Sequence, residues 1–165
     1  MSAKRVPSPI VRSADEGEWR SFAGGGVHIW KATEEETDGA FLLFEMRCGE
    51  GKVTPLHIHP ESDESMIVLE GEIWMHIDGV QTTVAAGGVA FAPRGVPHAF
   101  RVSSAAGVRM LCLHTPGCCE AFYRDASTSV AAGDPNAGVD VDMSRVVASA
   151  RTNGGMEVVG PPPFD

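Results

Sequence analysis

The sequence has no long apolar run, no cluster of basic residues and no CxxC pair. No stretch approaches the about 18 apolar residues of a membrane span, and Met1–Trp19 holds no apolar signal-peptide segment. Lys and Arg total 13 against 22 Asp and Glu, for a net charge of −9, and they form no basic stripe for a nucleic acid. We therefore expect a cytoplasmic protein with no membrane or nucleic-acid partner.

Cysteine is scarce and its spacing does not indicate a zinc knuckle. The chain has four cysteines, Cys48, Cys112, Cys118 and Cys119, and the last two are neighbours that cannot pair comfortably with each other. In a reducing compartment all four are expected to be free thiols.

Turn residues interrupt the chain at short intervals. The 165 residues include 19 glycines and 11 prolines, and 43% are hydrophobic, which suits one globular core. Nine strands with no helical period between them predict an antiparallel barrel or sandwich, with Asp78-Gly79 as a two-residue hairpin turn. The expected strands are Val27–Thr33, Ala40–Cys48, Val53–His59, Glu64–Glu70, Glu72–Ile77, Gln81–Ala85, Val89–Ala92, Ala99–Ser103 and Val108–Thr115.

The two ends of the chain differ from this middle part. Residues 1–24 are polar and contain proline, so we interpret them as an arm, with the barrel over 25–117. The tail, 118–165, is expected to pack on the barrel. Its predicted parts are a helical turn within Pro116–Arg124, a loop over Ser127–Gly138, a helix over Asp142–Ala150 that closes one end of the barrel, and a strand over Met156–Val159.

Two motifs carry the chemistry. The first runs Gly51-x5-His57-x-His59-x4-Glu64-x6-Gly71, and the second runs Gly87-x5-Pro93-x-Gly95-x2-His98. Residues two apart in a strand face the same side, so His57 and His59 direct their rings to one point. Glu64 begins the returning strand, and His98 follows a tight turn, so both can reach that point.

A lone histidine on a strand is more often packed or exposed than a ligand, but three imidazoles and a carboxylate converging on one interior favour a metal. A buried carboxylate without a cation costs several kcal/mol by order of magnitude. This donor set suits one divalent transition metal, Fe, Mn, Ni, Co, Cu or Zn, better than Ca or Mg. Four protein ligands on an octahedral ion would leave two positions for substrate or oxygen.

These motifs resemble the signature of the cupin superfamily. The first matches at every fixed position, and the second departs at its last position, where Val102 replaces the common Asn. The resemblance implies an all-β fold, an antiparallel double-stranded β-helix or jelly-roll barrel, here with a short C-terminal helix. The stretches Phe91–Phe100 and Thr115–Tyr123 resemble small quercetin-dioxygenase-like cupins. That resemblance implies that His57, His59 and His98 hold the metal, and that Glu64 both ligates it and acts as the catalytic base.

The strand faces shared with the ligands are apolar. Residues at even spacing from Glu64 and His98, together with one face of the last strand, form the expected substrate pocket: Met66, Val68, Phe100, Val102, Met110, Cys112 and His114. His114 is either an acid–base group beside the metal or a histidine at the surface or barrel mouth. The roles of His28 and His76 stay open, and Phe41, Phe91 and Phe122 are expected in the core. Arg94 and Arg101 are taken as the nearest cations in sequence and Arg101 should point outward, so a strongly anionic substrate is disfavoured.

Three functions are compatible with this pattern. The first is an oxidoreductase, a metal-dependent dioxygenase for a small apolar or aromatic enol- or catechol-like substrate, with Glu64 taking its proton. The alternatives are a non-redox metal-dependent isomerase, cyclase or lyase, and a non-catalytic barrel that binds a small molecule. The polar arm and the habit of small cupins predict a homodimer.

Overall fold

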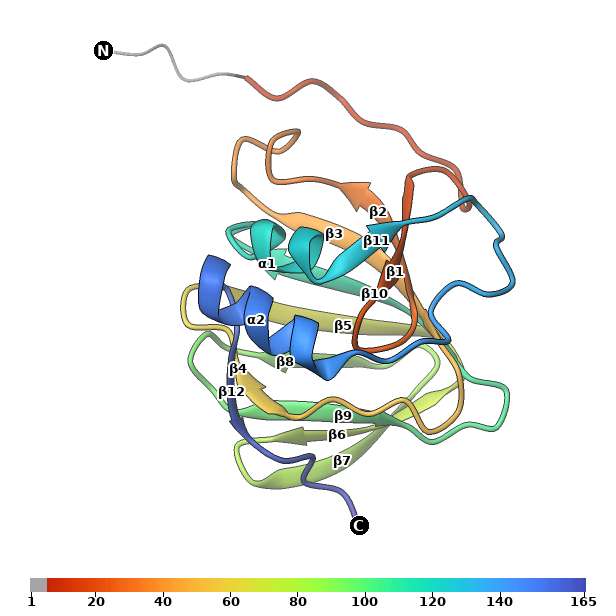
Figure 1. Cartoon of the computed structure of the whole chain (residues 1–165), viewed down its shortest axis with the longest axis vertical. Coiled ribbons are helices and arrows are strands. Elements are labelled where there is room, and N and C mark those ends of the chain that lie inside the picture. Colours follow the sequence, from red (N-terminus) through yellow and green to blue (C-terminus); the bar gives the residue numbers. More distant parts are fainter. Residues whose placement is uncertain (1–5) are drawn as a thin grey trace.

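The computed structural model describes residues 6–165, so the first five residues of the expected arm lie outside the described residues. Two antiparallel sheets face each other, as Figure 1 shows. This arrangement confirms the predicted all-β jelly roll with a short C-terminal helix.

The strands distribute over a seven-stranded and a five-stranded sheet. The larger sheet has the order β11 (Ser127–Ser129), β1 (Glu18–Phe22), β2 (Val27–Ala32), β3 (Leu42–Cys48), β10 (Val108–Thr115), β5 (Asp63–Glu70) and β8 (Val89–Ala92). The smaller has the order β12 (Glu157–Gly160), β4 (Leu56–Ile58), β9 (His98–Val102), β6 (Glu72–Ile77) and β7 (Val80–Ala85). All nine strands expected between residues 27 and 115 are present.

The ends of two elements show how local chemistry sets the boundaries. The expected strand Val53–His59 shortens to β4, because Pro55 has no N–H to donate and Val53 keeps only an isolated bridge to Arg101. The β6–β7 hairpin turns at Asp78 and Gly79, whose φ values of 49° and 82° are both positive. These are the angles of a type I′ turn, which confirms the predicted hairpin.

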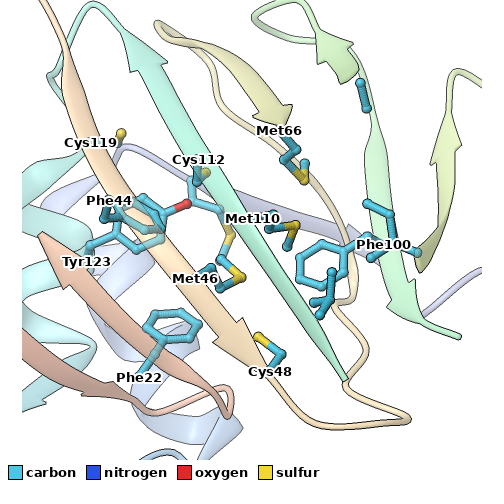
Figure 2. Close-up of a cluster of buried hydrophobic side chains, with 14 of the residues drawn as sticks. Phe22, Phe44, Met46, Cys48, Met66, Phe100, Met110, Cys112, Cys119 and Tyr123 are labelled. Carbon is cyan, nitrogen blue, oxygen red and sulfur yellow. The ribbon is translucent and has the colours of Figure 1, made fainter. Parts of the chain in front are cut away.

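The core lies between the sheets and follows the two-residue period of the strands. Inward residues of β5 pair with inward residues of β10, Met66 with Cys112 and Val68 with Met110. Figure 2 shows Met66 and Met110 close to Phe100, which comes from the smaller sheet. The apolar contact between the two sheets therefore lies directly beside the ends of the strands that carry the metal-binding motifs.

Strand β1 lies inside the segment 1–24 that the sequence assigned to the arm. Trp19 and Phe22 are buried, and Trp19 pairs with Ile29 of β2. Arg20 interrupts the apolar alternation that would predict a strand, because it is charged yet buried. Its Nε donates to Ser127 Oγ at 2.6 Å. That serine belongs to β11, a polar strand inside the expected loop Ser127–Gly138, so the two missed strands pair with each other.

Phe91 also differs from its expected place. Phe122 is buried and Phe41 half-buried, whereas Phe91 is 54% exposed. The register pairs Phe91 with Ser65, which lies on the outer face of β5, so Phe91 faces away from the core.

Two helices follow the barrel strands. Helix α1 (Glu120–Asp125) and helix α2 (Met143–Asn153) contact each other on one side of the barrel (Figure 1). Helix α2 begins one residue after the predicted start, where the Asp142 side chain accepts from the N–H groups of Ser144 and Arg145 at 3.1 and 3.3 Å. It ends at Asn153, three residues after the predicted end, with Gly154 as the C-cap. Strand β12 begins one residue after the predicted start and pairs with β4.

No helix within residues 6–165 has both the length and the apolar character that a membrane span needs.

Candidate metal centre

The four predicted ligands come from both sheets and converge at one end of the core. His57 of β4 and His98 of β9 are direct cross-strand partners, and His59 follows β4 by one residue. Glu64 projects from β5 of the opposite sheet. All four side chains are buried, and their candidate ligand atoms lie within 4.8 Å of one another. These residues therefore form a possible metal-binding group, as the motif spacing predicted.

Backbone carbonyls orient the three imidazoles. Nδ1 lies 2.8 Å from the Pro55 carbonyl in His57, 2.6 Å from the Gly155 carbonyl in His59 and 2.8 Å from the Val96 carbonyl in His98. A carbonyl can only accept, so each Nδ1 donates a proton and each Nε2 of a neutral ring keeps a free lone pair. This arrangement is the one that fixes histidine for metal ligation.

The remaining contacts fit a cation between the ligand atoms. His59 Nε2 has no hydrogen-bond partner, and it lies 3.4 Å from Glu64 Oε2. His98 Nε2 lies 2.7 Å from the same carboxylate oxygen. Lone pairs facing a carboxylate repel unless a proton or metal ion lies between them, so the donor set fits a divalent transition metal.

The electrostatics give His57 and Glu64 the protonation states that ligation needs. Burial, followed by the neighbouring His98 and His59, lowers the pKa of His57 to about 3, so this ring is neutral at pH 7. Burial by itself raises the pKa of Glu64, but the surrounding His114, His59 and His98 hold that pKa well below its usual range. Burial by itself lowers the pKa of His98, but the contact with Glu64 holds that pKa above its ordinary value, so metal binding would displace the His98 proton. Without metal the cluster therefore combines an ionised Glu64 with a neutral His57.

A second group of side chains surrounds the other carboxylate oxygen. The Cys112 thiol donates to Glu64 Oε1 at 2.9 Å, and His114 Nε2 lies 3.5 Å from the same oxygen. Tyr123 Oη lies 3.0 Å from His114 Nε2. Burial raises the pKa of the Cys112 thiol well above its ordinary value, so it stays a donor. His114 is fully buried, which decides between its two predicted places in favour of the interior.

A mostly apolar cavity opens beside the metal-binding group. Its polar lining comprises His57, His59 and Glu64 together with Lys52, Thr54 and Tyr123. Its apolar lining includes residues of both helices as well as of the barrel: Phe22, Met46, Phe100, Phe122, Met143, Val146 and Met156. Of the expected pocket residues Phe100 lines this cavity, whereas the others are buried in the core behind it: Met66, Val68, Val102, Met110, Cys112 and His114.

Sequence reasoning missed Lys52, Tyr123 and Gly155. Tyr123 is the one tyrosine of the chain and lies in α1, for which no fixed spacing to the motifs exists. Gly155 acts through its carbonyl, which has no side-chain signal. Lys52 could have been found, since it follows the first glycine of the motif and precedes His57 by five residues. Arg94, by contrast, binds the Asp63 carboxylate outside the cavity.

This fold and site define a cupin with a possible metal centre. Residues 42–114 match the Cupin domain family model. A quercetin 2,3-dioxygenase of Bacillus subtilis (strain 168) is 31% identical over 103 residues, which cover 62% of this chain and 30% of that protein. The chain is a small cupin that resembles quercetinase-like cupins, and the match spans about a third of the length of this curated relative.

Solved structures show the same fold. A predicted oxalate decarboxylase of Thermotoga maritima superposes with a TM-score of 0.58 at 24% identity, covering 66% of this chain and 99% of that one. KdgF from Halomonas sp. superposes with a TM-score of 0.57 at 17% identity, covering 67% and 94%. At these identities the likeness concerns the fold alone.

Proposed function

We propose that this cupin is a metal-dependent enzyme of dioxygenase type that acts on a small, mostly apolar or aromatic enol- or catechol-like molecule. One observation carries the proposal: three imidazole Nε2 atoms and a carboxylate converge at the wall of an apolar cavity. The 31% identity to a quercetin dioxygenase over 103 residues supports the same chemistry.

His57, His59, Glu64 and His98 would hold one divalent ion, with Fe, Mn, Co, Ni, Cu and Zn all compatible with nitrogen and carboxylate donors. Such an ion supplies Lewis acidity and, when it is redox-active, one-electron chemistry with dioxygen. No other cofactor or reductant is needed, because a dioxygenation puts both oxygen atoms into the product and the substrate is what is oxidised.

Glu64 is the proposed base. Its pKa is held well below the usual range, so it is ionised at neutral pH but only weakly basic. It would accept the hydroxyl proton of an enol or catechol only from an oxygen whose own pKa is lowered by the bound ion. The Cys112 thiol donates to Oε1, His114 lies 3.5 Å from that oxygen, and Tyr123 links His114 to the cavity wall. The apolar walls exclude water, which strengthens these polar contacts and protects a reactive carbanion-like substrate from protonation.

The test is oxygen uptake by metal-loaded protein. Metal is removed with a chelator, restored as Fe(II), Mn(II), Co(II), Ni(II), Cu(II) or Zn(II), and uptake is recorded with flavonols and substituted catechols. Uptake that requires a redox-active ion and falls at least about 100-fold in Glu64→Gln supports the proposal. The matched control is His76→Gln, a histidine of β6 outside the cluster, which should keep full uptake.

Two other outcomes would replace the proposal. Turnover of an enolisable substrate with no oxygen consumed would assign a non-redox isomerase, cyclase or lyase. Tight binding of these compounds with no product under any metal would assign a small-molecule binding barrel.

We also propose that the chain forms a homodimer in the cytoplasm. Strands β7 and β8 are edge strands that carry exposed apolar residues, with Val80 63%, Val89 64% and Phe91 54% exposed. Light scattering after size exclusion should give twice the chain mass, and Phe91→Asp should give the monomer. The four free thiols suit a reducing compartment, and cell fractionation tests the location.

A further inference from the structure

Lys52 brings a positive charge to the cavity. Among the described residues that line the cavity, it is the one lysine or arginine. Its neighbours on the wall are mainly apolar, and the Lys52 Nζ lies 5.5 Å from the centroid of the Phe22 ring. The expectation of a cavity without a nearby cation, drawn from Arg94 and Arg101, therefore does not hold.

The ammonium group of Lys52 has unused hydrogen-bonding capacity. It donates to the Gly24 carbonyl oxygen, which uses one of its three N–H donors. Within residues 6–165, no carboxylate forms an ion pair with Lys52. Burial lowers the pKa of its ammonium group, and the Cys48 thiol opposes part of this effect. In this Lys52 differs from six arginines of the described chain that do form ion pairs with carboxylates: Arg12, Arg20, Arg47, Arg94, Arg109 and Arg124.

The backbone around Lys52 leaves room for this ammonium group. An added Cβ at Gly24 would lie 3.1 Å from Lys52 Nζ and 2.8 Å from Phe22 Cε1. Glycine at this position thus lets the lysine head group lie against the 22–24 turn while facing the cavity. A half-buried cation without an anionic partner loses hydration that a ligand's anion can replace.

Lys52 and the ligand His57 border the same cavity from one chain segment. Lys52 precedes His57 by five residues, so an extended chain places their Cα atoms no more than about 17 Å apart. Thr54, between them, uses its Oγ1 to accept the Phe100 N–H at 3.0 Å. Lys52 is therefore the cationic donor available to a molecule that also reaches His57.

We propose that Lys52 binds an anionic group of the substrate, which makes the substrate an amphipathic organic acid. Its carboxylate contacts Lys52, its apolar body packs against Phe22 and Phe100, and its enol or catechol oxygen faces the metal-binding group. The last of these contacts rests on the proposed function, whereas the contact with Lys52 does not.

The experiment measures binding to zinc-loaded protein by calorimetry, so that no oxygen chemistry intervenes. The probes are catechols carrying a carboxylate on spacers of zero, one or two methylene groups, together with the uncharged primary amide of each and catechol itself. The variants are Lys52→Met, which keeps the length, Lys52→Arg, which keeps the charge, and Lys52→Gln as a second uncharged side chain. Arg101→Met, a cation outside the cavity that lies over Trp74, is the matched control.

Wild type should bind at least one carboxylate about tenfold or more tightly than its amide, as a charge-assisted hydrogen bond provides. Lys52→Met and Lys52→Gln should abolish this preference, whereas Lys52→Arg and Arg101→Met should keep it. A wild type without any preference, or a preference that survives in both uncharged variants, overturns the proposal. Oxygen uptake is measured separately. A Lys52-dependent preference without oxygen uptake refutes the oxygenase proposal and supports the anion site at Lys52. Oxygen uptake without the preference supports the oxygenase proposal and refutes the anion site.

Discussion

His28 offers a quantitative test of the packing around the cavity. The ring is fully buried and stacks between Phe22 and Phe44, with ring centroids 4.7 and 4.5 Å away. Both of its nitrogens lack a hydrogen-bond partner among the described residues. The perturbation is His28→Phe, which keeps the stacking and removes the two unsatisfied polar atoms.

Two effects of this substitution can be separated by pH. Removing buried unsatisfied atoms should raise the free energy of unfolding at pH 7 by about 1–3 kcal/mol, less the cost of fitting a slightly larger ring. Burial lowers the pKa of His28 to about 3, from an unfolded value near 6.5. Below pH 6.5 the unfolded chain therefore binds a proton that the folded protein refuses, and stability falls until the pH reaches about 3.

The size of the pH effect follows from linkage. At pH 5 the unfolded state gains about 2 kcal/mol from protonating this one histidine, whereas at pH 7 the gain is close to zero. The stabilisation by His28→Phe should therefore be about 2 kcal/mol larger at pH 5 than at pH 7. Urea unfolding of chelator-treated protein at both pH values measures this difference, which the packing cost does not affect. Equal stabilisation at the two pH values would refute a buried neutral His28.

Further predictions concern the metal-binding group and its supports. His59→Ala should abolish metal loading, as measured by elemental analysis. It should also remove the rise in melting temperature that metal gives the wild type, about 5–10 °C at a metal concentration a hundredfold above Kd. The control His76→Ala should retain both, and full loading of His59→Ala would contradict the ligand assignment. Gly155→Ala, at φ 76° with its Cβ 3.0 Å from Cys119 Cα, should displace the carbonyl that holds His59 and weaken metal affinity about 10- to 100-fold; unchanged affinity would refute this. Tyr123→Phe should keep the metal content but lower oxygen uptake about 10- to 100-fold, and full uptake would remove the tyrosine from the site.

Much of the fold could be predicted because strand chemistry is local. Alternation along β5 and β10 places Met66 and Cys112 inside, and both prove buried. The Asp78-Gly79 turn could also be predicted, since few other pairs accept two positive φ values. Strands β1 and β11 were missed because their polar residues, Arg20 and Ser127, satisfy each other only after the two strands have met.

The sequence alone identified the ligand set, because the two-residue period puts His57 and His59 on one strand face and the motif resemblance adds Glu64 and His98. Their convergence depends on the packing of the two sheets that carry them. Only the tertiary structure decided what surrounds them. Gly155 reaches His59 across 96 positions of the chain, and Tyr123 reaches His114 from a helix outside the motifs. Lys52 follows the motif's first glycine, yet its lack of an acidic partner emerges only when the 22–24 turn and α2 enclose the cavity. Ligand spacing is a property of neighbouring residues, whereas the shape and charge of a cavity depend on segments that meet only on folding.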